Sequence, residues 1–282
     1  MANLLSAGFL RLRRSRSFWV CLAVMAGVGV FEAVAGWWAM MDFRSSGVAD
    51  AMVSLDSRYF IFPFLSGILL SAFCALFVGA EYSDGAIRNK LAVGHSRGTV
   101  YLSNLLLCAA AGILLCLAYI SAVLAVGFPL LGAMHTPLPA VLWSTLCAIV
   151  MTSALAALFT MTAMLCQNKA VTAVICIFLA YFLLFLGIYL NARLSEPEMY
   201  PEQQYVQDGQ IVTDAARPNP NYVREAKRTV YQFLYDLPGC QAVQLAATIG
   251  TGTPPRLPLF SLAAVLLSTG GGILLFRKKD LK

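Results

Sequence analysis

Six stretches of this sequence are almost entirely apolar over about 20 residues or more, and Glu32 is the single formal charge within them. A helix crosses the hydrocarbon core of a bilayer in about 20 residues. Lipid offers the backbone no hydrogen-bond partners, so each stretch is expected to be an α-helix. The predicted spans are residues 18–40, 60–80, 100–126, 139–166, 170–190 and 257–276.

The composition agrees with a chain that lies in lipid. Hydrophobic residues make up 59% of the chain and charged residues 12%, against about 25% charged residues in a typical soluble domain. These proportions exclude a soluble enzyme, a disordered chain and a secreted disulfide scaffold. The expected fold is an all-α membrane protein in which residues 1–282 form a single transmembrane domain.

The cysteines are expected to be small buried residues. Seven of the eight lie in or beside the apolar stretches, and only Cys240 lies in a long polar segment, where it has no evident disulfide partner. No C-x-x-C motif and no Cys/His cluster occurs, so we predict no metal site.

Positive charges predict the orientation of the spans. With the N-terminus inside, the inner segments hold 12 of the 20 Lys and Arg residues and carry a net charge of +9, while the outer segments carry −2. Basic residues gather on the cytoplasmic side of membrane proteins. Both termini are therefore expected to be cytoplasmic, and the basic character of the chain gives no indication of a nucleic-acid partner.

Residues 1–16 are too short to cross a membrane. Leu5, Phe9 and Leu12 recur at helical spacing, and basic residues follow them. This pattern predicts an amphipathic elbow helix in the inner interface, whose arginines also fix the topology. A cleaved signal peptide is the alternative, with residues 33–35 as an A-x-A site. We expect no cleavage, because the apolar stretch continues beyond that site through two tryptophans.

The loop at residues 81–99 has two interpretations. Asp84 and Arg88 are spaced i, i+4, as are Ile87 and Leu91, and Gly94 is suited to end a helix. The segment is then a short cytoplasmic helix followed by a turn. An ordinary solvated loop is the other interpretation, and the periodicity alone favours it.

Residues 191–256 are expected to form an extracellular loop. Its first part is rich in proline and polar residues, so we expect it to be irregular. Apolar residues then repeat at helical spacing from Val223 to Leu237, and Pro238-Gly239 ends the pattern. Residues 240–249 are apolar again and are expected to return toward the membrane.

No motif for catalysis is present. The chain lacks G-x-x-x-x-G-K-[ST], H-E-x-x-H and G-x-S-x-G, and His95 and His135 stand alone in separate loops. We therefore predict no catalytic residue and no enzymatic activity in this chain. No internal repeat is evident, which disfavours an inverted-repeat carrier.

The layout and one motif together resemble a known family. The segment reads E-Y-S-D-G-A-I-R-N-K-L at residues 81–91 and H-S-R at residues 95–97. It is similar to the E-x-x-x-G-T-I-R-x-x-L…S-R pattern of the permease subunits of bacterial ATP-binding cassette (ABC) type-2 transporters, with Ala86 in place of the usual Thr. The basic elbow, six spans, large fifth loop and basic tail extend this resemblance over essentially the whole chain.

The resemblance implies a function. Glu81, Asp84, Gly85, Arg88 and Arg97 become candidates for coupling to a separate ABC ATPase, which would bind ATP and Mg²⁺. It also implies a second permease copy, identical or related, and a multi-pass location in the bacterial cytoplasmic membrane. The expected activity is export of a hydrophobic or amphipathic substrate such as a peptide, drug or lipid.

Several residues in the spans are candidates for a substrate path. Glu32 either takes part in substrate passage or extends its carboxylate toward the outer interface. An aromatic stripe in the fifth span and two phenylalanines in the second either line a path or pack against lipid and protein. These aromatic candidates are Phe178, Phe182, Phe185 and Tyr189, and Phe73 and Phe77.

Small residues recur at every fourth position in the third and fourth spans, which predicts close helix packing. Two other function classes remain open. The chain could be a non-transporting resistance or sensor protein that binds a peptide through residues 191–256, or a carrier or channel that needs no ATPase.

Overall fold

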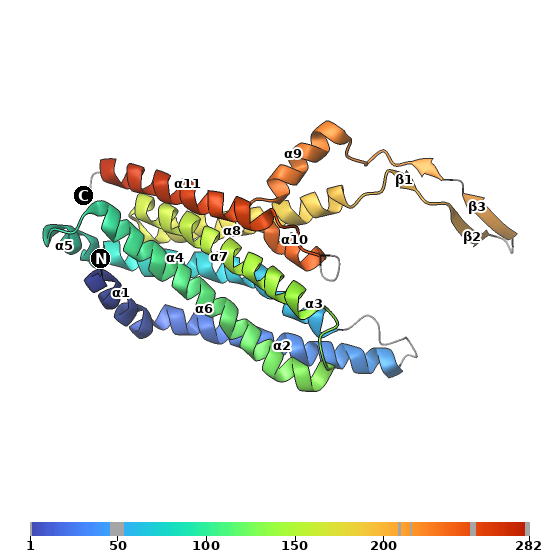
Figure 1. Cartoon of the computed structure of the whole chain (residues 1–282), viewed down its shortest axis with the longest axis horizontal. Coiled ribbons are helices and arrows are strands. Elements are labelled where there is room, and N and C mark those ends of the chain that lie inside the picture. The colour runs from blue at the N-terminus through green and yellow to red at the C-terminus, as the bar shows by residue number, and fades with distance from the viewer. Residues whose placement is uncertain (1, 46–53, 208–209, 215, 249–251, 280–282) are drawn as a thin grey trace.

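Six long helices account for most of the molecule (Figure 1). The computed structural model describes residues 2–45, 54–207, 210–214, 216–248 and 252–279. All six helices are long and apolar enough to cross a membrane, which confirms the predicted number of spans. Their bounds are α2 Arg16–Ser45, α4 Phe62–Ser83, α6 Arg97–Leu131, α7 Leu138–Cys166, α8 Lys169–Leu194 and α11 Leu257–Lys278.

The helices extend past the apolar stretches that predicted them. α6 begins where the Ser96 side chain accepts a hydrogen bond from the Thr99 amide at 3.2 Å, and it ends before Gly132, whose φ is +83°. A hydropathy pattern ends at the membrane interface, whereas backbone hydrogen bonding continues until a capping residue stops it. The short helix α3, Leu55–Tyr59, lies just before the apolar stretch at residues 60–80 and leads into α4.

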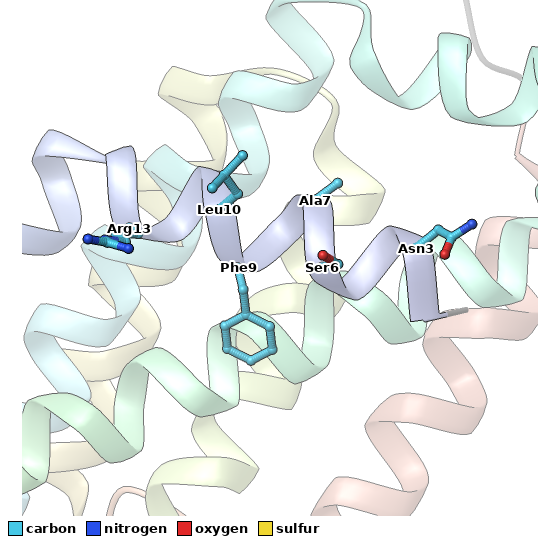
Figure 2. Close-up of a pocket in the computed structure, with 6 residues that line it drawn as sticks. All are labelled: Asn3, Ser6, Ala7, Phe9, Leu10 and Arg13. Atoms are coloured by element: carbon cyan, nitrogen blue, oxygen red, sulfur yellow. The ribbon is translucent and has the colours of Figure 1, made fainter.

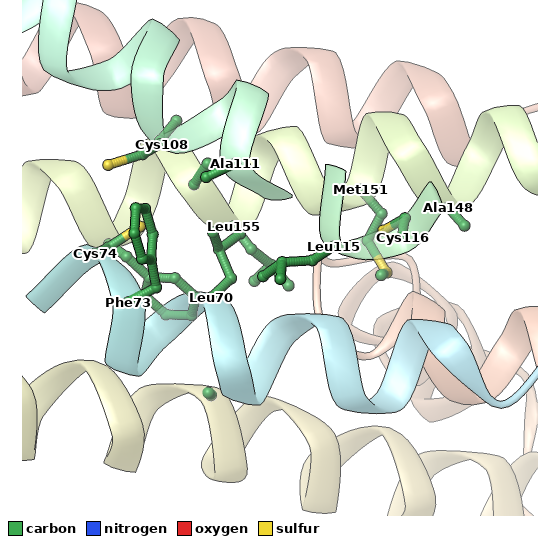
Figure 3. Packing of buried hydrophobic residues seen from close by; sticks show 14 of the residues in the cluster. Leu70, Phe73, Cys74, Cys108, Ala111, Leu115, Cys116, Ala148, Met151 and Leu155 are labelled. Atoms are coloured by element: carbon green, nitrogen blue, oxygen red, sulfur yellow. The ribbon is translucent and has the colours of Figure 1, made fainter. Parts of the chain in front are cut away.

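Helices α4, α6 and α7 pack against one another at the centre of the bundle (Figure 3). Leu70 and Phe73 from α4 lie near Leu115 from α6 and Leu155 from α7, and all four are buried. The small-residue rows predicted in α6 and α7 lie in this core. Gly112 of α6 approaches Thr152 of α7 so closely that a Cβ on Gly112 would lie 2.9 Å from the Thr152 methyl group.

All eight cysteines are free thiols, and all but Cys166 are buried. This confirms the expectation that they serve as small buried residues. Cys240, the one cysteine placed in a polar segment by the sequence, is buried against α8, where its thiol donates to the Leu183 carbonyl at 3.2 Å.

Both described ends of the chain lie at one end of the bundle, together with two short helices, α1 (Ala2–Arg14) and α5 (Ala86–Ala92) (Figure 1). The chain turns between α1 and α2 at Ser15, whose hydroxyl accepts from the Phe18 amide at 3.4 Å. Leu4 and Leu12 of α1 are buried, and α1 packs on α6. The predicted amphipathic helix is present.

The segment between α8 and α11 contains two pairs of antiparallel strands, so the prediction that its first part is irregular is wrong. β1 (Met199–Tyr200) pairs with β4 (Arg217–Pro218), and β2 (Gln203–Gln207) pairs with β3 (Gln210–Asp214). The strands contain β-branched and aromatic residues and flank an Asp-Gly dipeptide in the sequence, which is a common hairpin sequence. The strands project from the bundle at the end opposite α5 (Figure 1).

Two helices follow the strands. α9 (Glu225–Tyr235) occupies most of the predicted periodic stretch, and Gly239, with a φ of +96°, turns the chain into α10 (Gln241–Ala247). α10 packs on α4, α7 and α8, as the apolar sequence predicted. The absence of a side chain at Gly187 allows this contact, because a Cβ there would lie 2.8 Å from the Cys240 Cα.

We expect Gly112→Ala to destabilise the protein, because the added methyl group meets Thr152 and Leu70 in a packed core. The melting temperature in detergent, read by fluorescence-detected gel filtration, should fall by several degrees, which corresponds to about 1–3 kcal/mol.

The matched control is Gly270→Ala on α11, where the Cβ meets nothing within 4 Å. Alanine favours a helix over glycine by up to about 1 kcal/mol, so this variant should be unchanged or more stable. Equal effects of the two substitutions would contradict the close approach of α6 and α7.

Candidate functional site

The predicted coupling residues lie at the α5 end of the bundle, where a short helix joins two long ones. α4 ends at Ser83, and Gly85, with a φ of +67°, reverses the chain into α5. Gly94, with a φ of +94°, then leads the chain to Ser96, which caps α6. Ile87 is buried and anchors α5 against the bundle. Of the two interpretations of residues 81–99, the structure therefore supports the short helix.

Glu81 is the centre of this region. Its side chain is 1% exposed, and its carboxylate forms ion pairs with Arg11 of α1 and with Lys90 of α5, which also donates a hydrogen bond to it. The amide nitrogen of Asn104, on α6, donates to the same carboxylate at 2.7 Å. Glu81 itself belongs to α4, so one buried carboxylate ties four helices together.

Arg11 also contacts an aromatic ring. Its guanidinium lies 3.7 Å from the centre of the Phe77 ring, which belongs to α4 one turn before Glu81. Stacking on an aromatic face and pairing with a carboxylate both hold the guanidinium in this position. The buried carboxylate is stable because cations and an amide replace the water it has lost.

Two further contacts fasten α4 and α6 to their neighbours. The Tyr82 hydroxyl donates to the Met164 carbonyl of α7 at 2.5 Å. Arg97, the first residue of α6, donates to the carbonyls of Phe276 at 3.0 Å, Arg277 at 3.2 Å and also Lys279. The last carbonyls of a helix lack partners within the helix and carry partial negative charge. Arg97 therefore binds the C-terminal end of α11.

The outward face of this region carries Asp84, Arg88, Asn89 and Val93, and the Val93 side chain is 79% exposed. The i, i+4 spacing of Asp84 and Arg88 does not lead to an ion pair between them, since neither makes an ion pair within the described residues. Asp84 follows the last residue of α4, and Gly85 breaks the helix before α5, so the two residues never share one helical face.

The five coupling candidates thus have different places. Asp84 and Arg88 are exposed, Gly85 forms the turn, Glu81 is buried beneath α5, and Arg97 is half-buried against α11. A second protein that met this surface would contact Asp84 and Arg88. Glu81 and Arg97 instead hold the helices in place.

The candidates for a substrate path do not come together. Phe73 and Phe77 are stacked in the core, with ring centres 5.1 Å apart. Phe178, Phe182 and Phe185, as well as Tyr189, are exposed along α8.

Glu32 forms an ion pair with Arg58 of α3 at 3.0 Å. Arg58 also offers its carbonyl oxygen to the Tyr119 hydroxyl at 2.7 Å. The carboxylate is therefore paired inside the protein.

Sequence reasoning missed four residues of these polar clusters: Arg11, Lys90, Asn104 and Arg58. Arg11 directly precedes the buried Leu12, on the inward side of α1, and Asn104 is a polar amide in an apolar stretch. Intramembrane polar groups usually have partners, so Asn104 was a usable indication. In the described part of the chain, no group of three or more His, Cys, Asp or Glu residues is placed to hold a metal ion.

Residues 4–187 match a family model described as "ABC-2 family transporter protein". The matched region runs from α1 into α8 and includes Glu81, its three partners and the whole of α5. No curated protein matches the chain.

We expect Glu81→Ala to loosen α5, because the substitution removes the acceptor that Arg11, Lys90 and Asn104 share. Breaking a buried ion pair costs about 3–5 kcal/mol. Arg11 and Lys90 are partly exposed and can rehydrate, so about 2 kcal/mol is expected. Hydrogen exchange of the amides of residues 86–93, read by mass spectrometry, should accelerate by about tenfold or more.

Asp84→Ala is the matched control, since this neighbouring carboxylate is exposed. It should leave exchange in α5 and the melting temperature unchanged. Slow exchange in α5 despite Glu81→Ala would mean that Ile87 alone holds the helix.

Proposed function

The chain belongs to the ABC-2 transporter family, and from that membership we propose that it is the permease subunit of an ATP-driven exporter in the bacterial cytoplasmic membrane. In this proposal the chain itself hydrolyses no nucleotide. A separate ABC ATPase binds ATP and Mg²⁺ and presses on α5.

The single observation that carries the coupling proposal is the attachment of α5. This helix offers exposed charged and apolar side chains on one side, while Ile87 and Lys90 fix its other side to the bundle. Because α5 is joined to α4 and α6 by short turns, a displacement of α5 moves both helices. A loosely tethered loop would absorb such a displacement instead.

We assign the direct contact to Asp84 and Arg88, with Val93 as an apolar contact beside them. Glu81 and Arg97 act as positioning residues, because their side chains are engaged within the chain. An acidic group on the ATPase is the expected partner of Arg88, since charge pairs across an interface fix its register.

The proposed orientation is supported by the exposed basic residues at the α5 end of the bundle. Arg13, Arg14, Arg16, Arg277 and Lys278 are all exposed there. Basic residues beside membrane spans favour the cytoplasmic side. We therefore place both termini and α5 in the cytoplasm, where ATP is available, and the strands and α9 outside.

A substrate path is proposed to lie between two copies of the permease. The candidate residues are not gathered within one bundle, and Phe178, Phe182 and Phe185 are exposed on α8. An aromatic surface suits a hydrophobic or amphipathic substrate such as a peptide, drug or lipid, and Glu32 would contribute only if its pair with Arg58 opened. The outward direction of transport is proposed by analogy with the exporters of this family.

A non-transporting peptide sensor is the second candidate. The projecting strands favour it, because a strand edge can receive an extended peptide. A sensor of this kind needs no ATPase, so the coupling experiment separates the two proposals.

We expect Arg88→Glu to weaken coupling without unfolding the protein. Placing a glutamate opposite the expected acidic group of the ATPase costs about 2–5 kcal/mol of binding free energy. The affinity for the ATPase that co-purifies with the wild-type chain should therefore fall at least about tenfold. Reconstituted transport and substrate-stimulated ATP hydrolysis should fall with it, while the melting temperature stays unchanged.

Lys227→Glu is the matched control, because it makes the same charge reversal on the exposed face of α9, at the other end of the molecule. It should leave ATPase binding intact. The proposal fails if Arg88→Glu binds the ATPase normally, or if the wild-type chain recruits no ATPase.

Cysteine labelling should establish the orientation. Asn89→Cys on α5 should react with a membrane-impermeant maleimide only in inside-out vesicles, and Thr229→Cys on α9 only in intact spheroplasts. The wild-type chain serves as background, and burial raises the pKa of the Cys240 thiol to about 12, which suppresses its reactive thiolate. The opposite pattern would invert the proposed topology.

A further inference from the structure

The corner between α1 and α2 presents a basic and apolar surface that neither α5 nor the bundle uses. Residues 2–16 contain four arginines, and no acidic residue occurs in the chain before Glu32. Arg11 points inward to Glu81 and Phe77. Arg13, Arg14 and Arg16 are exposed, and none of their guanidinium groups has a partner within the described residues.

Apolar side chains share this surface. Phe9 is 47% exposed and Leu10 is 53% exposed, and their side chains extend from the two sides of α1 in Figure 2. Asn3, Ser6, Ala7 and Arg13 line the same shallow pocket. The buried side of α1, with Leu4 and Leu12, packs against the bundle. The outward side is therefore the one that can contact lipid or another molecule.

Trp19 extends the surface onto α2. Its indole nitrogen donates to the Arg13 carbonyl at 2.7 Å, and its side chain is 52% exposed. This hydrogen bond joins the indole of α2 to the backbone of α1, so it holds Trp19 at the corner beside Arg13. Tryptophan is enriched where a protein crosses the membrane–water interface, because its ring is apolar and its N–H is polar.

We propose that the α1–α2 corner binds the headgroups of anionic phospholipids. Phe9, Leu10 and Trp19 enter the headgroup–acyl boundary, and Arg13, Arg14 and Arg16 meet phosphate and other anionic headgroup oxygens. Charge complementarity supports lipid as the occupant, because three unpaired guanidinium groups without a neighbouring carboxylate attract anionic phosphodiesters. An acidic surface on a protein would satisfy the arginines, but it would leave the three apolar side chains against polar groups.

The proposal goes beyond coupling to an ATPase and does not depend on it. The lipid would hold α1 in the interface from outside, while Arg11 holds the same helix to Glu81 from inside. Each basic residue near an anionic membrane surface strengthens association by about fivefold, so three arginines can select lipids from a mixed bilayer.

Quenching of Trp19 by brominated lipid tests the proposal directly. The full chain, with Trp37→Phe, Trp38→Phe and Trp143→Phe, keeps Trp19 as its single tryptophan and is placed in nanodiscs of phosphatidylcholine and phosphatidylglycerol. At equal mole fraction, brominated phosphatidylglycerol should quench Trp19 with a relative association constant at least about fivefold above that of brominated phosphatidylcholine. High salt should reduce this ratio.

Two variants separate charge from structure. A triple variant with Arg13→Gln, Arg14→Gln and Arg16→Gln should bring the ratio of the two association constants close to one. Lysine at the same three positions should keep most of the preference for phosphatidylglycerol. The matched control replaces three exposed basic residues at the far end, Arg217→Gln, Arg224→Gln and Lys227→Gln, and should leave the ratio unchanged. If the Gln variant fails to fold, the headgroup comparison on the unaltered corner still decides the question.

Four results would overturn the proposal. Equal quenching by the two lipids would remove the anionic preference. No quenching by either lipid would place the corner away from the bilayer, against a second copy or another protein. Loss of the preference on adding inorganic phosphate at constant ionic strength would indicate a simple anion site. Loss of quenching when the ATPase binds would assign the corner to that partner. Failure of ATPase recruitment, by contrast, would count only against the coupling proposal.

Discussion

The arrangement at one end of this molecule depends on a single buried carboxylate. Glu81 has lost its water, and a carboxylate in that position is stable only while Arg11, Lys90 and Asn104 remain in contact with it. Because these partners come from α1, α5 and α6, the requirement to solvate one charge fixes the relative positions of four helices. Packing of small residues in the core sets the distances between the helices, but it does not determine where α5 sits.

Other charged side chains in or beside the membrane-spanning helices are also paired within the protein. Glu32 pairs with Arg58, and Asp56 accepts hydrogen bonds from the amides of His135 and Thr136 at 3.0 Å each. At the start of α11, Arg256 pairs with Asp236 at 2.7 Å. Each contact joins segments that the sequence places apart, so the charges act as links between helices. The exposed charges of α5 and of the α1–α2 corner, by contrast, are available to contact other molecules.

The sequence predicts those features that depend on the solvent, and it predicts poorly those that depend on long-range contacts. Lipid demands apolar helices of a set length, so all six spans were evident. The hydrophobic spacing of their residues predicted α1 and α9 equally clearly. The role of Glu81 was not evident, because Arg11 and Asn104 approach it only after α1 and α6 have packed on α4. The strands were missed because prolines and polar residues outweighed the Asp-Gly hairpin sequence.

The connections among the helices determine which parts of the bundle can move with α5. α4 and α6 continue from α5 through one short turn each, and both pack on α7. α8 packs on α4, and α10 packs on α4, α7 and α8, with Gly187 allowing the close approach to α8. A displacement of α5 therefore reaches the far end along continuous helices, and the aromatic face of α8 moves with α4. Since that face is exposed, the proposed assembly of two copies leads us to expect a change between the copies rather than the opening of a channel within one.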